Sequence, residues 1–220
     1  IISADALFNY LGHPDWVVID TRFDLSQPEW GRSDYLEGHI PGAVYADLDK
    51  DLSGAITPQS SRHPLPDSLN FIHTAQKLGI SNSSQVVIYD TVGGAFASRL
   101  WWMLKYYGHP KVAVLDGGYT YWINHNYPVS SGDSINPAGT FDGTPHENML
   151  ATTRDVTEMV SKSTGCLIDA RSPQRYIGSF EPIDPIAGHI PGAINRFHQL
   201  NLLDDFRLLP ADILKSQFTE

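Results

Sequence analysis

Two identical six-residue segments constrain this chain more than any other feature of its sequence. Gly-His-Ile-Pro-Gly-Ala occupies residues 38–43 and occurs again at residues 188–193. Each copy follows an apolar run that ends in Asp-x-Arg, at residues 20–22 and 169–171. The offset between the copies is the same for both motifs to within one residue. A repeat of this length and order indicates that the chain contains one ancestral unit twice.

Length and composition agree with two ordinary globular domains. The chain has 220 residues, of which 41% are hydrophobic and 18% charged, so it has enough apolar material for a core. Its net charge of -10 disfavours nucleic acid or an anionic membrane as the main partner. No apolar run reaches the roughly 18 residues that a membrane span needs. The single cysteine, Cys166, excludes an internal disulfide and favours a cytoplasmic setting, with a cleaved signal upstream of Ile1 as the alternative.

Apolar runs predict the strands of a parallel sheet. Continuous runs without alternation are typical of strands that are covered on both faces. They occur at residues 16–19, 86–89, 111–115 and 166–169. We expect the thiol of Cys166, at the start of the last run, to be buried in an apolar site and inert.

Two helices are predicted between the strands of the first unit. One begins after the capping residue Asp67 and has four apolar residues at helical spacing, namely Leu69, Ile72, Ala75 and Leu78. The other runs from about Phe96 to Tyr107. Strands that alternate with helices predict an α/β fold, in which ligands bind at the carboxyl ends of the strands.

The turn after the strand at residues 86–89 has the composition of an anion site. Asp90 ends the strand, and the Gly-rich residues 91–95 lead into the helix that begins near Phe96. Backbone N–H groups of such a turn point inward, and the helix N-terminus adds partial positive charge. The sequence therefore predicts that this loop can hold an anion.

The repeat is not completed within 220 residues. Residues 128–148 are rich in Pro, Gly, Ser and Asn without periodicity, which predicts a linker. After it, the second copy repeats the first helix and strand, and residues 210–218 begin the counterpart of the helix at Leu69. By the repeat spacing, the counterpart of Asp90 would fall at about position 240. We expect a parent protein longer by roughly 60 to 80 residues, by analogy with the first unit.

With these motifs, the chain resembles the tandem rhodanese-type sulfurtransferases, which comprise thiosulfate and 3-mercaptopyruvate sulfurtransferases. Besides the repeated motifs, the resemblance rests on Tyr89-Asp90, Arg99-Leu100-Trp101-Trp102-Met103-Leu104, Gly108-His109 and Leu115-Asp116-Gly117-Gly118-x-x-x-Trp122. It implies two α/β rhodanese-like domains, each a mainly parallel sheet flanked by helices. The first would span residues 1–127, the linker 128–148, and the second 149–220, truncated before its active-site loop.

The resemblance also implies a chemistry. In that family a cysteine of the C-terminal domain, at the place that Asp90 occupies here, takes sulfane sulfur from a small anionic donor. It holds the sulfur as a persulfide and passes it to a thiol or to cyanide, without a metal or other cofactor. Asp90 cannot carry sulfur, so the first domain should be catalytically silent. We expect no sulfur transfer by the chain as it stands.

Three residues are candidates for binding the donor. The resemblance implies that arginines near Arg171 hold the anion, and guanidinium groups at Arg171 and Arg175 could bind a carboxylate bidentately. The alternative is that Arg171 braces its loop by pairing with an acid, as Arg22 would in the silent unit. His39 could act on a substrate carbonyl, although the shared motif of His39 and His189 also fits a loop cap.

Two other functions remain open at this point. A non-catalytic rhodanese-like module for binding or regulation would also explain Asp90. Phosphoryl transfer through Asp90 is disfavoured, because the second Asp that such sites use two residues later is replaced by Val92. The nine histidines show no metal-ligand spacing. The sequence does not separate thiosulfate from mercaptopyruvate as donor, and it does not indicate the oligomeric state.

Overall fold

The structure is a computed structural model that describes residues 1–219. It consists of two compact units. The first comprises Ile1–His146 with Asp204–Arg207, and the second comprises Glu147–Leu203 with the residues from Leu208 onward. Within the described residues, no helix has the length and apolar character that crossing a bilayer requires.

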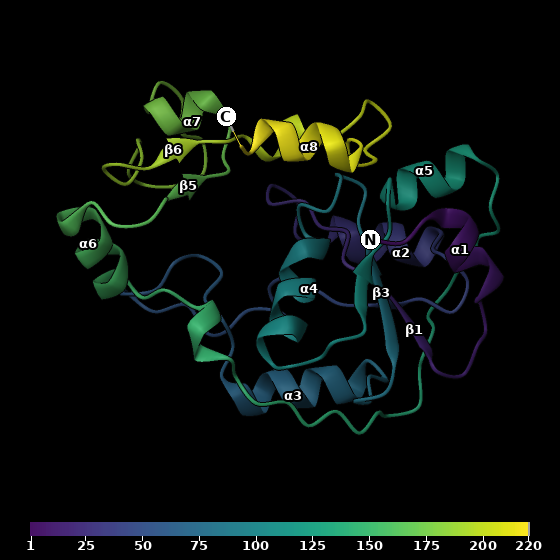
Figure 1. The fold of residues 1–220 in the computed structure, drawn as a ribbon. Coiled ribbons are helices and arrows are strands. Elements are labelled where there is room, and N and C mark those ends of the chain that lie inside the picture. The colour runs from purple at the N-terminus through teal and green to yellow at the C-terminus, as the bar shows by residue number, and fades with distance from the viewer. Residues whose placement is uncertain (220) are drawn as a thin grey trace. The chain divides into compact units, whose positions relative to one another are not determined.

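The first unit is built on a four-stranded parallel sheet in the order β2-β1-β3-β4 (Figure 1). The strands are β1 (Trp16–Asp20), β2 (Val44–Tyr45), β3 (Gln85–Tyr89) and β4 (Val112–Val114). β1 and β3 lie side by side in the middle of the sheet and are in register along five residue pairs, from Trp16 with Gln85 to Asp20 with Tyr89. The residues that follow β1 and β3 therefore leave the sheet at the same edge, which is its carboxyl edge.

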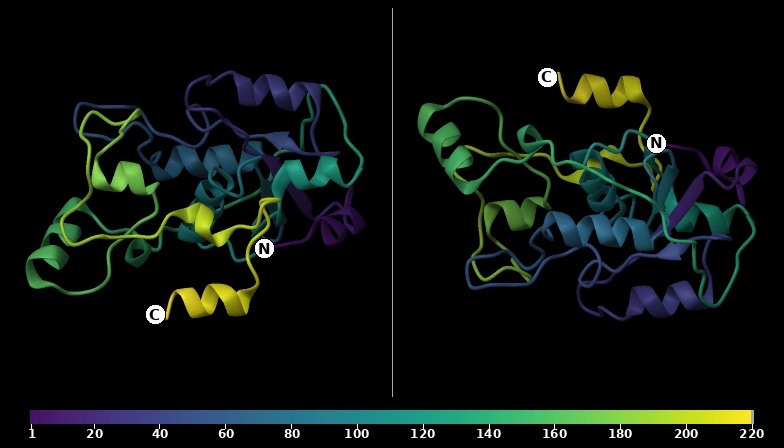
Figure 2. Two further views of the ribbon diagram at one scale, coloured as in Figure 1. Left: turned by 90° about the horizontal axis from the view of Figure 1, so that it is seen from above. Right: turned by 90° about the horizontal axis from the view of Figure 1, so that it is seen from below.

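Helices cover both faces of this sheet. Residues of α3 and α4 pack with Val17 and Ile19 on one face, whereas residues of α1 and α5 pack with Val18 on the other. Figure 2 shows α1 and α5 together, with α3 on the opposite side of the sheet. Burial on both faces explains why the strands are continuous apolar runs. The helices are α1 (Ala4–Asn9), α2 (Trp30–Glu37), α3 (Ser68–Lys77), α4 (Ala97–Tyr106) and α5 (Gly118–Asn124).

The predicted helix after Asp67 is confirmed as α3, with one difference in the residues that it buries. The Asp67 side chain accepts a hydrogen bond from the backbone N–H of Asn70 at 3.0 Å, so it is the expected N-cap. Ala75 and Leu78 are buried, but Leu69 is 79% exposed and Phe71 lies in the core instead. The first turn is therefore oriented by Phe71, whose ring packs against Tyr107 with centroids 4.7 Å apart.

The aperiodic segment after α5 packs closely against the first unit. Its Phe141 is buried in the core, where its ring meets Phe71 of α3 edge-on, and the backbone N–H of Phe141 donates to the carbonyl of Ile80 at 3.1 Å. A Cβ added at Gly139 would lie 1.9 Å from the oxygen of Ile80, so only glycine fits this approach. Residues of the expected linker, up to His146, belong to the first compact unit.

The second unit contains a two-stranded parallel sheet. β5 (Ile168–Asp169) pairs with β6 (Ile194–Asn195). The capping box of Thr152 and Asp155 begins α6, which runs over Thr153–Lys162. The remaining elements are α7 (Pro173–Ile177), α8 (Ala211–Gln217) and the short 3-10 helices Glu147–Met149 and His198–Asn201.

The apolar residues of this small sheet are much more exposed than their counterparts in the first unit. Ile168 is 48% exposed, whereas Ile19 of the first copy is fully buried. The expectation that Cys166 is buried is wrong, because its thiol is exposed. The physical reason is that β5 has only β6 beside it in the described chain, while β1 lies between two strands under helices on both faces.

Candidate functional site

The Asp90 carboxylate lies at the carboxyl end of β3 and is surrounded by backbone N–H groups. Oδ1 accepts from the N–H groups of Val92 and Gly94, both at 2.9 Å. Oδ2 accepts from Phe96 at 2.8 Å and from Ala97 at 2.9 Å. Four N–H donors therefore converge on one buried anion at the start of α4, as the composition of the turn predicts.

Glycines make this arrangement of donors possible. Gly93 and Gly94 have φ angles of 70° and 90°, in the left-handed region that favours glycine. On the opposite side, a Cβ at Gly118 would lie 2.3 Å from the carbonyl oxygen of Asp90. The backbone of α5 therefore comes close to the strand end, where the N–H of Tyr119 donates to the same carbonyl at 2.8 Å. The loop therefore encloses one carboxylate, that of Asp90.

Arg22 braces the carboxyl end of β1. Its guanidinium donates to both oxygens of Asp20, at 2.7 Å from Nη2 to Oδ2, and to the carbonyl of Gly38 at 2.6 Å. It also pairs with Asp34 and stacks over the ring of Tyr119 at 4.1 Å. Both side chains of the Asp20–Arg22 pair are fully buried. Burial raises the pKa of Asp20, and the neighbouring Arg22 opposes that effect.

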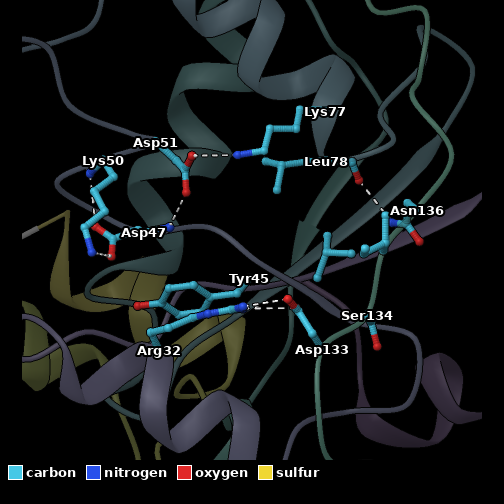
Figure 3. A pocket seen from close by; sticks show the side chains of 12 residues that line it. Arg32, Tyr45, Asp47, Lys50, Asp51, Lys77, Leu78, Asp133, Ser134 and Asn136 are labelled. Carbon is cyan, nitrogen blue, oxygen red and sulfur yellow. Dashed lines mark hydrogen bonds and ion pairs between the residues drawn. The ribbon is translucent and has the colours of Figure 1, made fainter.

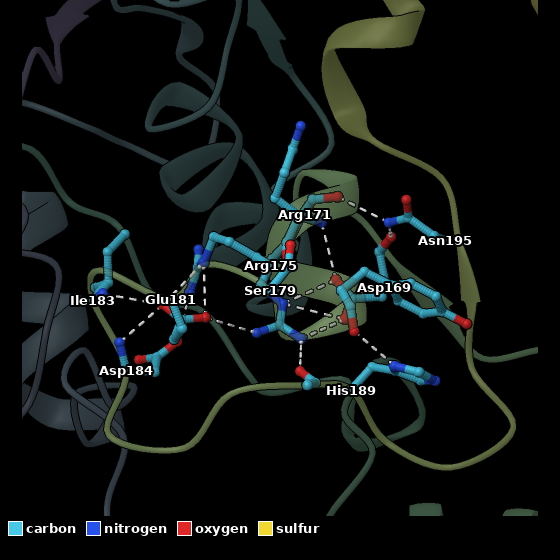
Figure 4. Close-up of polar contacts among 12 residues, drawn as sticks. Asp169, Arg171, Arg175, Ser179, Glu181, Ile183, Asp184, His189 and Asn195 are labelled. Carbon is cyan, nitrogen blue, oxygen red and sulfur yellow. Dashed lines mark hydrogen bonds and ion pairs between the residues drawn. The ribbon is translucent and has the colours of Figure 1, made fainter.

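Arg171 repeats this arrangement in the second unit (Figure 4). It donates to Asp169 at 2.7 Å and to the carbonyl of Gly188 at 2.6 Å, which are the counterparts of Asp20 and Gly38. Because this pair is partly exposed, the hydrogen bonds from Arg171 lower the pKa of Asp169. The bracing role that was the alternative for Arg171 is thus present in both copies.

Arg175 contacts two acids of the loop that follows α7 (Figure 4). Its Nε donates to Oε2 of Glu181 at 2.9 Å, and its Nη2 donates to Asp184 at 2.7 Å. Hydrogen bonds from Arg175 and from the backbone of Asp184 lower the pKa of Glu181 to about 2. Glu181 also lies 3.4 Å from NH1 of Arg171, so the structure brings the two predicted arginines together around one carboxylate. Their role in donor binding stays a prediction.

His39 is buried beneath its loop and uses both ring nitrogens. Nδ1 bonds to the carbonyl of Tyr35 at 2.9 Å, and Nε2 lies 3.2 Å from the hydroxyl of Ser134. The His39 ring stacks on the Tyr35 ring at 4.2 Å. His189 repeats the stack, on Tyr176 at 3.8 Å, with its Nδ1 bonded to the carbonyl of that residue. The loop-capping role is therefore present in both copies, and an action of His39 on substrate stays a prediction.

One histidine–carboxylate pair has no counterpart among the predicted site residues. Nε2 of His63 lies 3.0 Å from Oδ1 of Asp49, and its ring meets Phe23 edge-on. Burial lowers the pKa of His63, and Asp49 opposes that shift. Phe23 also contacts Phe96 of the Asp90 loop at 5.8 Å, so the pair lies near that loop. No local motif marks it, because the Ser/Pro-rich loop between the two residues has no periodicity.

The described residues 1–219 contain no group of three or more His, Cys, Asp or Glu side chains that could hold a metal ion. The polar groups described at the strand ends are backbone N–H groups, guanidinium groups and the acids paired with them. Together, the sheet with helices on both faces and the loop of N–H donors at the start of α4 define an α/β protein whose polar groups gather at the carboxyl edge of the sheet.

Comparison with known proteins agrees with an α/β protein of this class and identifies its family. A family model described as "Rhodanese-like domain" matches residues 3–125. The chain belongs to the rhodanese family, and it is homologous to the family's sulfurtransferases.

Curated relatives and a solved structure are also similar to this chain, in sequence and in fold. The chain is 39% identical to a probable 3-mercaptopyruvate sulfurtransferase of Pseudomonas aeruginosa, over 100% of this chain and 78% of that protein. It is 32% identical to a thiosulfate sulfurtransferase of Bos taurus, over 91% of this chain and 68% of the relative. The structure of a 3-mercaptopyruvate sulfotransferase from Escherichia coli superposes with a TM-score of 0.87 at 30% identity, covering 100% of this chain and 82% of the other. The predicted α/β rhodanese fold with a partial second domain is confirmed.

Proposed function

We propose that this chain is the major part of an enzyme that transfers sulfane sulfur. The donor would be a small anion, thiosulfate or 3-mercaptopyruvate, and the acceptor a thiol or cyanide. Relatives named for both donors align with the chain. Sulfur would be carried as a cysteine persulfide, because a thiolate can attack the donor sulfur and release the remaining anion.

The observation that carries this proposal is the set of four N–H groups around Asp90. Such a loop lowers the pKa of a cysteine placed at its centre, so that the reactive thiolate is present at neutral pH. The same donors would stabilise the terminal negative charge of a persulfide. In the first unit the position is Asp90, which has no sulfur and fills the loop with its own carboxylate. The first unit would therefore keep the architecture of such a site without its reaction.

Sulfur transfer by the 220-residue chain alone is not expected. Its one cysteine, Cys166, precedes β5 and so lies at the amino end of that strand. Asp169 and Arg171 lie at the other end, where sheets of this type place their chemistry. No described backbone loop surrounds the Cys166 thiol as the Asp90 loop surrounds its carboxylate.

An assay that compares the complete protein with the 220-residue chain tests the proposal. The protein expressed from the complete reading frame should produce thiocyanate from cyanide with thiosulfate or mercaptopyruvate, and a persulfide should be detected by mass spectrometry. The 220-residue chain should produce none under the same conditions. Brisk thiocyanate formation by the chain alone would contradict the assigned role of Asp90, and its absence from the complete protein would contradict the enzymatic proposal.

Arg171, Arg175 and His39 remain our candidates for donor binding. A donor carboxylate would either displace Glu181 from Arg171 and Arg175 or accept hydrogen bonds from the guanidinium N–H groups that do not bond to Glu181. Replacing Arg175 by Lys in the complete protein, with Lys162→Arg as a surface control, should raise the KM for the donor and leave the persulfide-to-cyanide step unchanged. An unchanged KM would remove Arg175 from the donor site.

A non-catalytic binding or regulatory module is the second candidate. The closed Asp90 loop favours it, and so does the pairing of both arginines with acids. This function predicts that the complete protein forms no persulfide with either donor, yet retains its fold. The assay above separates the two functions.

A further inference from the structure

The first unit has a hollow that is lined by residues outside the Asp90 loop. A hollow of about 400 Å³ opens beside the edge strand β2, and none of residues 90–97 lines it (Figure 3). Its volume is within the range of small-molecule sites. Val44 and Leu78 line the hollow with the 5% of each residue that is exposed, and Ile135 at its border is 88% exposed.

Charged side chains of both signs surround this apolar surface. Arg32 pairs with Asp133 at 2.6 Å, Lys50 lies 3.7 Å from Asp47, and Lys77 lies 3.9 Å from Asp51. Three cations and three acids therefore line the hollow, and their formal charges cancel. A ligand of one sign gains little from such a field, whereas a ligand with both signs can contact a cation and an acid together.

The Lys77–Asp51 pair has unused hydrogen-bonding capacity. At 3.9 Å the two groups attract each other but are too far apart for a hydrogen bond. Lys77 is 72% exposed, and among residues 1–219 this pair is the one contact that its ammonium group makes. Asp51 accepts from the backbone N–H of Asp47 through Oδ2, which leaves Oδ1 to face Lys77 (Figure 3). A carboxylate could bind Lys77 and an ammonium could bind Asp51 without breaking a short ion pair.

Ser134 adds a polar group with a defined orientation. Nδ1 of His39 faces the carbonyl of Tyr35, which can only accept, so a neutral His39 carries its proton on Nδ1. Nε2 then accepts from the Ser134 hydroxyl, and the Ser134 oxygen keeps its lone pairs for a donor.

We propose that this hollow binds a small zwitterion of the α-amino acid class, with the apolar side chain against Val44, Leu78 and Ile135. The carboxylate would bind Lys77, and the ammonium would bind Oδ1 of Asp51. The proposal concerns a different site from the Asp90 loop and does not depend on the sulfurtransferase assignment.

Three matched probes test the proposal on the 220-residue chain. L-leucine carries both charges, 4-methyl-2-oxopentanoate lacks the ammonium, and 3-methylbutylamine lacks the carboxylate. Binding is followed by amide shifts in two-dimensional NMR and by calorimetry. L-leucine should shift Val44, Leu78 and Ile135 and bind at least about tenfold more tightly than either single-charge probe, because each of them loses one charge-assisted hydrogen bond.

Variants separate the roles of the two charges. Lys77→Met should weaken L-leucine about tenfold and leave the amine unchanged, whereas Lys111→Met, outside the hollow, should change neither. Asp51→Asn keeps an acceptor for the Asp47 N–H and should weaken L-leucine and the amine alike. Equal binding of the oxo acid and L-leucine would overturn the proposal in favour of a simple anion site. Absence of shifts at Val44, Leu78 and Ile135 in about 20 mM L-leucine, which would fill roughly 95% of a site with a Kd of about 1 mM, would overturn it outright.

Discussion

The backbone N–H of Ala97, in the first turn of α4, donates to Oδ2 of Asp90 at 2.9 Å. Phe96 supplies a second N–H to the same oxygen, and two more reach Oδ1. Because four backbone groups depend on one side chain, Asp90 determines the conformation of the whole loop. The same four hydrogen bonds to Asp90 therefore give the loop its anion-holding arrangement and help to stabilise the first unit.

Replacing Asp90 by Asn should destabilise the first unit. The amide has one acceptor oxygen, so its NH2 group would face either the Phe96 and Ala97 donors or the Val92 and Gly94 donors. We expect a loss of about 2 kcal/mol in the free energy of unfolding, the usual cost of buried donors left without partners. Urea unfolding followed by Trp fluorescence measures it. The exposed Asp15→Asn is the control, and equal stability of the two variants would contradict the structural role of Asp90.

Replacing Asp90 by Cys should create an acidic thiol. The four N–H groups that hold the carboxylate would then favour the thiolate, so the pKa should fall from about 8.5 in a free cysteine to about 7 or lower. In a Cys166→Ser background, the rate of iodoacetamide alkylation as a function of pH gives this pKa. A value at or above that of free cysteine would show that the donors do not act on a sulfur at this position.

The two Asp-x-Arg pairs should differ in their tolerance to lysine. Arg22 is fully buried and bonds to Asp20, Asp34 and Gly38 at once, which a single ammonium group cannot reproduce. We expect Arg22→Lys to cost about 3 kcal/mol of stability, as for a broken buried ion pair. The partly exposed Arg171 should lose less in the same substitution. Denaturant unfolding of both variants measures the two losses of stability. A larger loss for Arg171→Lys than for Arg22→Lys would contradict the stronger bracing role that we assign to Arg22.

The stability of the first unit should fall in mildly acidic solution. Burial lowers the pKa of His63, with Asp49 opposing, and burial lowers the pKa of His109. The folded chain then binds fewer protons than the unfolded chain, in which histidine titrates at about 6.5. The stability contributed by the two neutral histidines is fully present above about pH 6.5. It is lost as the pH falls from there through the lower pKa values that His63 and His109 have in the folded chain.

Unfolding free energies between pH 7.5 and 5.5 test this direction. The double variant His63→Asn, His109→Asn should show a flatter dependence on pH than the parent chain. An identical slope in both proteins would mean that other groups govern the acid response.

Much of the first unit could be predicted from the sequence, because its strands are continuous apolar runs and its turns are marked by glycine. The anion loop at Asp90 was predicted for the same reason. The position of Phe71 in the core was missed, since Leu69 fits the helical period equally well and only tertiary packing distinguishes them. The exposure of Cys166 could not be read from its apolar run, because a run shows what can be buried and not which strands are there to cover it.

The pair of His63 and Asp49 was missed for a different reason. A contact that forms across a long irregular loop has no period and no fixed spacing, so pattern reasoning has nothing to detect. Conversely, the motif at His39 drew attention as a reactive residue, although its repeat at His189 already pointed to a common structural role. The stack of each histidine on a tyrosine now gives that role a physical basis.

These two stacks bear on how the halves can be compared. Tyr35 lies in α2 and precedes His39 by four residues, whereas Tyr176 lies in α7 and precedes His189 by thirteen. The same contact is thus reached by chain paths of unequal length, with the extra loop placed before the helix in one half and after it in the other. Counting by the constant offset would match Tyr35 with Asp184 and transfer an aromatic role to an acid. Equivalence between duplicated domains follows from shared contacts, and position number is a guide only where no loop has moved.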